Sequence, residues 1–312
     1  MKKIVGICLM LYIIFVCCYF FNISICYISE KNKYSLCHNK IDITTSTLFM
    51  KSKSFLDAYI WDRYKGPKVS FCTTYKDRFE QISKTLPINL ANNRMDDSKV
   101  EFILIDFDPT DTRLKEFIFE NFSKDIASGY LKYYQTDKMP LWDFSVAKNT
   151  SHYYATNDIV VNLDADNYTG YRGGKFVSDV LANNHKSFLW QKRDLVNGAY
   201  GRISFYRKDF DYLGGYDEKL PEPAGYQDDD LMNRAKTYLN RIHRNFLNDA
   251  IKNDKDVTIK HTKKGKPWLD MQKANKKHSE ENIKNGKIRA NNGIYGIRDG
   301  VIRVMSLDSK VK

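Results

Sequence analysis

Two aspartates one residue apart stand where an apolar run ends, in the stretch "VNLDADNYTG" at 161–170. Two carboxylates at this spacing repel each other unless water or a cation lies between them. A calcium loop of the EF-hand type is excluded. Such a loop, if it began at Asp164, would need Gly and Glu at the positions that Thr169 and Lys175 occupy. A solvated turn and a divalent-cation site formed by Asp164 and Asp166 remain as the two interpretations.

A second acidic cluster, the run QDDD at 227–230, precedes an apolar pattern of helical spacing that begins at Leu231. Acidic residues stabilise a helix N-terminus through the helix dipole, which accounts for one of them. Three in succession exceed that need, so one carboxylate is a candidate general base for deprotonating an attacking hydroxyl. Arg234, one turn further along, is placed to pair with another of the three.

Alternating strands and helices must position these clusters. The apolar patterns predict strands at 68–72, 100–106, 130–135 and 158–164, separated by helices at 77–91, 112–122 and 144–156. Such alternation predicts βαβ units and an α/β fold with a mostly parallel central sheet flanked by helices. The carboxyl ends of parallel strands meet at one edge of the sheet, where ligands bind. Polar residues follow three of these strands: Thr73, Thr74 and Tyr75, then Asp106 and Asp108, then Asp164 and Asp166.

No phosphate-cradling glycine motif is present in the sequence. If the ligand is a nucleotide, its diphosphate must therefore be neutralised in another way. A divalent cation held by carboxylates does this by bridging protein and phosphate oxygens. The second acidic cluster strengthens the metal interpretation, and a solvated turn remains the alternative.

Several segments of the sequence resemble elements of a known enzyme family. "VNLDADN" is similar to the DXD element of glycosyltransferases with the GT-A fold, which is Rossmann-like. "GGYDEKLPEPAGYQDDDLMNRA" resembles the corresponding element of the β-1,4-galactosyltransferases and related N-acetylgalactosaminyltransferases. "VSFCTTYKDR" and "FSVAKN" resemble the family's first strand and the helix before its DXD strand. The resemblance covers roughly 66–262 and implies an inverting hexosyltransferase that uses a UDP-sugar, Mn²⁺ or Mg²⁺, and a glycan or other hydroxyl acceptor.

The resemblance also implies roles for individual residues. Asp228 aligns with the base, and Gln227 and Asp229 with acceptor-binding positions. The metal ligands would be Asp166, Asp164 and His261. The donor nucleotide-sugar would be bound by Thr73, Tyr75, Arg78, Asp106, Asp164, Gly198, Gly201 and Arg202.

Two departures from the family pattern leave an alternative open. Gln227 stands where the family has Glu, and the preceding "PEPAGY" lacks the family's tryptophans and glycines. The alternative is a catalytically inactive relative that binds a glycan or a membrane.

The N-terminus predicts a membrane anchor. About 25 apolar residues follow Lys2 and Lys3, and as a helix they would extend about 37 Å across a bilayer core of about 30 Å. We therefore expect a signal-anchor at 1–29, a stem at 30–65, the GT-A domain at 66–265 and a basic extension at 266–312. The charge of Lys2 and Lys3 favours a single-pass, type II orientation. The compartment would be a Golgi- or ER-like lumen in a eukaryote, and otherwise a bacterial or viral membrane.

The positive charge of the chain is concentrated at one end. Residues 1–233 hold 30 basic and 30 acidic side chains, so the whole excess of +12 lies in 234–312. Such an end can bind nucleic acid, an anionic membrane or an acidic polymer, or it can be a solvated surface. The predicted anchor and the neutral segment before the tail argue against nucleic acid, and no nucleic-acid partner is expected.

Overall fold

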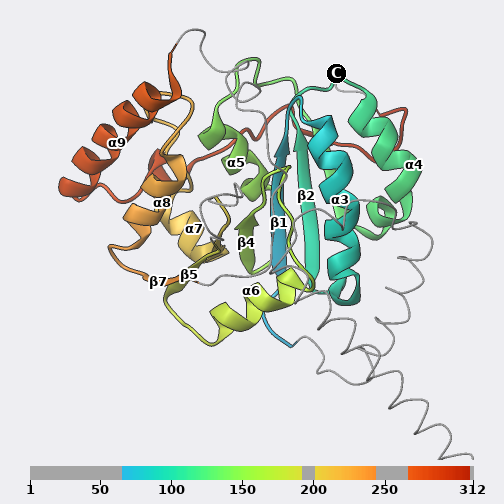
Figure 1. The fold of residues 1–312 in the computed structure, drawn as a ribbon, viewed down its shortest axis with the longest axis horizontal. Helices are drawn as coiled ribbons and strands as arrows, with labels where there is room; N and C mark the ends of the chain where they lie inside the picture. The colour runs from blue at the N-terminus through green and yellow to red at the C-terminus, as the bar shows by residue number, and fades with distance from the viewer. Residues whose placement is uncertain (1–64, 192–200, 244–265, 310–312) are drawn as a thin grey trace, which may run out of the picture. The chain divides into compact units, whose positions relative to one another are not determined.

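The computed structural model describes residues 65–191, 201–243 and 266–309. Its first half alternates strands and helices in the predicted order (Figure 1). The elements are β1 (Val69–Tyr75), α3 (Phe79–Asn93), β2 (Val100–Asp106), α4 (Arg113–Ser128), β3 (Leu131–Gln135), α5 (Phe144–Tyr153) and β4 (Ile159–Asn162), with a 3₁₀ turn at Arg94–Asp96. Each predicted strand and helix is present, and β1 continues three residues beyond its predicted end.

The second half contains shorter elements. They are α6 (Gly173–Ala182), β5 (Ser187–Trp190), β6 (Ile203–Tyr206), α7 (Arg207–Leu213), α8 (Gln227–Ala235), β7 (Asn240–His243), α9 (Trp268–Lys284), a 3₁₀ turn at Asn291–Gly293 and β8 (Ile302–Arg303). Most of these strands have four residues or fewer, too short for a period-two pattern to be read from the sequence.

The strands form one mixed sheet in the order β7-β5-β6-β4-β1-β2-β3-β8. Strands β1 to β4 are mutually parallel, which confirms the predicted α/β fold with a mostly parallel centre. β6 is antiparallel to β4, and β8 is antiparallel to β3. The chain moves outward from β1 to β3 and then returns to place β4 on the other side of β1. A crevice forms at such a reversal, beyond the carboxyl ends of the two strands.

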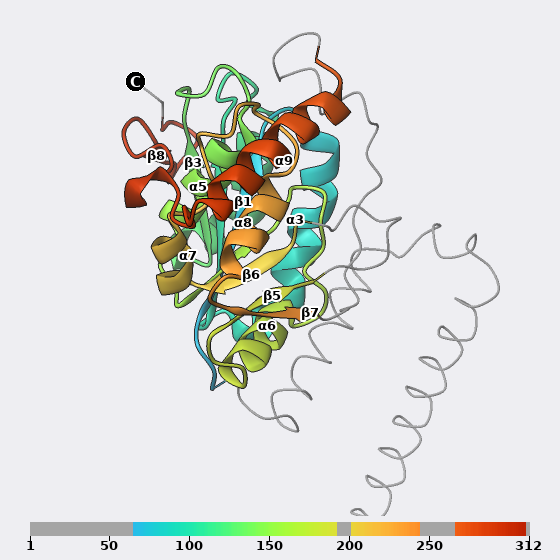
Figure 2. The same ribbon diagram turned by 90° about the vertical axis from the view of Figure 1, so that its left-hand side faces the viewer.

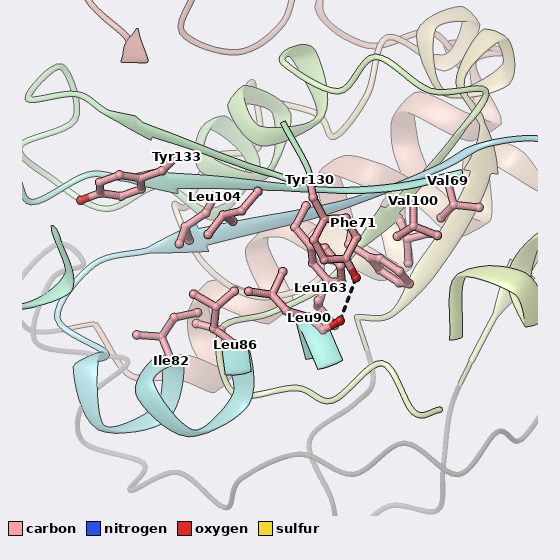
Figure 3. Packing of buried hydrophobic residues seen from close by; sticks show 14 of the residues in the cluster. Val69, Phe71, Ile82, Leu86, Leu90, Val100, Leu104, Tyr130, Tyr133 and Leu163 are labelled. Atoms are coloured by element: carbon pink, nitrogen blue, oxygen red, sulfur yellow. Dashed lines mark hydrogen bonds between the residues drawn. The ribbon is translucent and has the colours of Figure 1, made fainter. Parts of the chain in front are cut away.

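Both faces of the sheet are covered, so the core has two layers. Phe102 and Leu104 of β2 pack with α3, α4 and α6, whereas Ile103 and Ile105 pack with α5, α7 and α8. This double burial explains why β2 is an unbroken apolar run. In the first layer the Tyr130 hydroxyl donates to a carbonyl oxygen of α3 at 2.8 Å (Figure 3).

The segment predicted as a basic extension contributes to the fold. β8 pairs with β3, opposing Arg303 to Tyr134. α9 lies beside α8 (Figure 2) and buries Met271, Asn275 and Ser279. Among residues 65–191, 201–243 and 266–309, every helix is too short or too polar to cross a membrane. The predicted anchor at 1–29 and most of the stem lie outside these residues.

Candidate active site

The two acidic clusters lie at the reversal point of the sheet. β1 and β4 are neighbours, with Cys72 opposite Asn162, so the residues that follow each strand share one edge. Asp164 lies two residues beyond the end of β4, and Thr73 and Tyr75 form the end of β1. The predicted convergence of these strand ends is therefore observed.

The chain turns between the two aspartates of the DXD sequence. The amide of Asn167 donates to the carbonyl oxygen of Asp164 at 2.9 Å, which closes a turn. The predicted strand at 158–164 is therefore too long, because β4 ends at Asn162 and Asp164 begins this turn. The Asn162 side chain braces the turn by donating to Asp164 Oδ1 at 3.1 Å and to the Gly201 carbonyl oxygen at 2.9 Å.

Asp166 faces the loop that follows β1. Its Oδ2 lies 3.4 Å from the Arg78 guanidinium, and its Oδ1 accepts a hydrogen bond from the Asn167 side chain at 2.5 Å. Burial and the negative charge of Asp164 raise the pKa of Asp166 to about 6, although Arg78 opposes the shift. A carboxylate whose ionised form is destabilised by a neighbouring negative charge provides a place where added positive charge is stabilising.

A buried lysine joins the two acidic clusters. Lys148 Nζ lies 2.8 Å from Asp228 Oδ1 and 3.7 Å from Asp164 Oδ1, although these aspartates are far apart in sequence. The Tyr216 ring centroid is 5.3 Å from the same ammonium group. Lys148 is not among the residues predicted from the sequence to form the site. Its sequence neighbours give no sign of this role, which becomes visible only in the structure, where 147–152 of the same helix are all buried.

Gly201 lies directly beside this lysine. A Cβ added to Gly201 would lie 2.9 Å from Asp228 Oδ2, 3.1 Å from Lys148 Nζ and 3.2 Å from Asp164 Oδ2. Gly201 therefore keeps a small space open against all three charged groups. The neighbouring Arg202 is buried and donates to Asn167 Oδ1 at 2.6 Å. Two residues predicted to bind the donor thus lie against the acidic clusters.

The cluster of Lys148, Asp164 and Asp228 carries a net negative charge, which affects the pKa values of Lys148 and Asp228. Burial acts to lower the pKa of Lys148, but the charges of Asp164 and Asp228 outweigh it and the pKa is raised. Burial also raises the pKa of Asp228; Lys148 opposes this shift and Asp164 adds to it. A carboxyl with a raised pKa is a stronger base than an ordinary aspartate, as general-base catalysis requires.

The three aspartates of α8 have different environments, because successive helical residues point about 100° apart. Asp228 faces Lys148, and Asp229 is half-buried. Asp230 is buried and accepts from Arg234 Nε at 2.8 Å, which confirms the predicted pairing one turn along. Gln227, predicted to bind the acceptor, is buried, and its Oε1 has no hydrogen-bond partner among the described residues.

The loop before α8 is held from α9. Gly225 and Tyr226 both have left-handed φ values, +84° and +71°, and they turn the chain into the helix. A Cβ on Gly225 would meet the backbone of Gln272 at 3.2 Å. Asn275 Nδ2 donates to the carbonyl oxygens of Glu222, Ala224 and Gly225 at 2.7–3.0 Å. α9 thus fixes the segment that leads to Asp228.

The predicted nucleotide contacts on β1 and β2 are mostly buried. Thr73 and Tyr75 are buried, and the Tyr75 hydroxyl donates to Asp111 at 3.3 Å. Asp106 is fully buried and accepts from the Tyr133 hydroxyl at 2.7 Å and from Gln135 at 3.0 Å. Burial raises the pKa of Asp106 to about 6 against these hydrogen bonds. This geometry favours Asp106 as a support beneath the site.

Two predicted site residues, Gly198 and His261, lie outside the described residues, and their roles stay predictions. Within the part of the chain that the structure describes, no group of three or more His, Cys, Asp or Glu side chains is arranged to hold a metal. Asp164 and Asp166 fit a smaller role, because Mg²⁺ and similar cations are bound by one or two carboxylates together with substrate phosphates and water. The two carboxylates are thus consistent with a cation that the protein and the substrate bind together.

The chain has four glycosylation sequons, at Asn22, Asn121, Asn149 and Asn167, and two of them are buried in the described part of the structure. Asn149 is fully buried and exchanges hydrogen bonds with the backbone of Tyr216. Asn167 is 1% exposed within the turn of the acidic pair. A glycan on either side chain is incompatible with the fold described here.

Comparisons with known proteins identify distant structural neighbours. No protein-family model and no curated protein matches the sequence. The chain is similar in structure to the mannosyltransferase PcManGT from Pyrobaculum calidifontis, solved with GDP-Man and Mn²⁺. That match has 16% identity, a TM-score of 0.47 and 64% coverage of each chain. It is also similar to residues 1–349 of TarS from S. aureus, at 17% identity, a TM-score of 0.47 and coverages of 57% and 58%.

TarS was also solved with UDP-GlcNAc, and that structure matches at 16% identity with a TM-score of 0.43, covering 57% of this chain and 59% of its own. The matches thus span less than two thirds of these proteins. A likeness this distant does not assign a function.

Proposed function

We propose that the chain is a glycosyltransferase that moves a hexose or N-acetylhexosamine from a UDP-sugar to a hydroxyl acceptor. The observation that carries the proposal is the meeting of Asp164, Lys148 and Asp228 in one cluster beside Gly201, at the reversal point of the sheet. This edge is where α/β sheets bind ligands. The resemblance of both acidic segments to glycosyltransferase motifs supports the same function.

Asp228 is proposed as the general base. Its Oδ1 accepts from Lys148, so Oδ2 is the oxygen directed toward the space beside Gly201. There it takes the proton of the acceptor hydroxyl as the hydroxyl oxygen bonds to the anomeric carbon. The bond from that carbon to the diphosphate breaks, and the electron pair leaves with the diphosphate. Attack from the side opposite the leaving group inverts the anomeric configuration.

Asp166 and Asp164 are proposed to hold a divalent cation, Mn²⁺ or Mg²⁺. When bound, such an ion supplies positive charge to the departing diphosphate. Arg78, beside Asp166, provides a second positive group on the same side of the site. Lys148 holds Asp228 and Asp164 in place, because its ammonium lies within 4 Å of both. We further propose that the predicted N-terminal anchor attaches this domain to a membrane.

The test compares two aspartates of the same helix turn. Asp228→Asn removes the proposed base, whereas Asp229→Asn changes the neighbouring, half-buried carboxylate. We expect the rate of UDP-sugar hydrolysis with Mn²⁺ to fall about 100-fold or more for Asp228→Asn, the usual contribution of a general base. Asp229→Asn should stay within severalfold of wild type. Equal rates for wild type and Asp228→Asn would refute the proposed mechanism, and no hydrolysis by either would favour the alternative, a non-catalytic glycan-binding protein.

A further inference from the structure

Four aromatic rings from separate segments pack in a continuous row. The ring centroids are 5.6 Å apart from Phe107 to Trp142, 5.6 Å from Trp142 to Phe144 and 6.4 Å from Phe144 to Trp268. Each pair meets edge to face, at 84° to 86°. The four residues come from the end of β2, the loop before α5, the start of α5 and the start of α9. We call Phe107, Trp142, Phe144 and Trp268 the aromatic row.

The aromatic row runs from the core to the surface. Phe107 is 3% exposed, Trp142 and Phe144 are half-buried, and Trp268 is 36% exposed. Leu141 and Leu269, each next to a tryptophan, are both 64% exposed. Large apolar side chains gathered at the surface, rather than scattered, mark a binding surface.

One side of the row is tied to the loop that follows β1. Lys76 Nζ donates to the carbonyl oxygens of Met139 and Pro140, both at 3.0 Å, just before Leu141 and Trp142. Lys76 is two residues from Arg78, which pairs with Asp166. The loop that carries the row and the loop beside the acidic turn are therefore held together.

The other side of the row is tied to the segment before Asp228. The amide of Phe144 donates to the Pro223 carbonyl oxygen at 3.0 Å. Phe144 also lies one helical turn before Lys148, on the same side of α5. α5 and α8 pack on the same face of the sheet, and α9 packs against α8. The row is thus continuous with the cluster that holds the proposed base.

We propose that the aromatic row binds the pyranose rings of the glycan acceptor, an inference that rests on the proposed function. A pyranose presents a face of C–H groups with partial positive charge, which packs on the negative face of an aromatic ring. Rigid aromatic side chains provide this area at a small cost in conformational entropy. The segment before Asp228, "PEPAGY", contains no tryptophan, so Trp142 and Trp268 supply indole rings from other elements.

Binding of methyl β-glycosides to the full chain, in the presence of UDP and Mn²⁺, tests this inference. The panel contains methyl glucoside, galactoside and N-acetylglucosaminide and their β-linked disaccharides. Saturation-transfer NMR on the sugar C–H protons gives both contact and affinity. We expect at least one member to bind, with Trp268→Ala weakening its affinity about fivefold to tenfold and Trp268→Phe about twofold. Trp142→Phe, which keeps a ring against Phe107, should also bind.

Met305→Ala is the matched control, because Met305 is a half-exposed apolar side chain outside the row, and it should leave the affinity unchanged. Binding by no member of the panel, or equal binding by wild type and Trp268→Ala, overturns the inference. The same NMR experiment can also show saturation of the uracil protons of UDP. If that signal is present in wild type and lost in Trp268→Ala, the inference is overturned, because the row then binds the nucleobase.

Hydrolysis of UDP-sugar by the same samples separates this inference from the proposed function. Hydrolysis without glycoside binding means that the aromatic row does not bind the acceptor although the chain is a glycosyltransferase. Row-dependent glycoside binding without hydrolysis means that the row binds glycan and that the proposed activity is wrong.

Discussion

Replacing Lys148 by Met should destabilise the fold strongly, because it leaves buried carboxylates without their positive partner. At an effective dielectric constant of about 20, unit charges 2.8 Å apart attract by about 6 kcal/mol, and at 3.7 Å by about 4.5 kcal/mol. Desolvation of the ions offsets much of this attraction. The loss of one partner from a buried pair nevertheless costs about 3–5 kcal/mol, which is our expectation for Lys148→Met.

The assay is urea unfolding of the full chain, followed by tryptophan fluorescence and circular dichroism. The matched control is Lys276→Met, which removes an exposed ion pair with Glu280 on α9 and should change stability by less than about 1 kcal/mol. A double-mutant cycle with Asp228→Asn should give a coupling energy of about 2 kcal/mol or more. A loss below about 1 kcal/mol for Lys148→Met, or additive effects in the cycle, would refute the reasoning.

Three further predictions follow from the buried groups. Asp106 has a pKa of about 6 in the fold and 3.8 ordinarily, so the folded chain binds more protons between these values and stability falls as pH rises from about 4 to about 6. Asp106→Asn should remove about 3 kcal/mol of that pH dependence, measured by unfolding at pH 4 and pH 7. Asn275→Ala should cost about 2–4 kcal/mol in urea unfolding, because it leaves backbone groups at 222–225 without partners, and a cost below about 1 kcal/mol would contradict this. Gly201→Ala should lower the rate of UDP-sugar hydrolysis at least about tenfold and leave the circular dichroism spectrum native, because the added Cβ would lie 2.9 Å from Asp228 Oδ2. An unchanged rate would show that the space beside Gly201 is not used.

The central sheet could be predicted because its strands are buried on both faces. β2 is an unbroken apolar run, and the helices around it have clear apolar spacing. The ends of β1, β2 and β4 were placed correctly at one edge, since parallel strands share that edge. The antiparallel strands β5 and β6 have four residues each, too few for a pattern to emerge.

The parts of the site that could not be predicted depend on tertiary contacts. Lys148 reads as an exposed helical lysine until Asp164 and Asp228 are brought to it by β4 and α8. The turn after β4 could not be seen either, because apolar residues continue to Leu163, one residue past the last residue of the strand. Trp268 meets Phe144 although the two residues are far apart in sequence, and α9, which carries Trp268, packs on α8.

The most direct test of the proposed activity is release of UDP from a panel of UDP-sugars by the full chain, with and without Mn²⁺. Wild type is predicted to hydrolyse at least one UDP-sugar in a metal-dependent manner, and Asp166→Ala is predicted to reduce that rate about 100-fold or more. Equal rates for wild type and Asp166→Ala, or no dependence on the metal, would contradict the assignment of the acidic turn after β4 as a metal-dependent donor site.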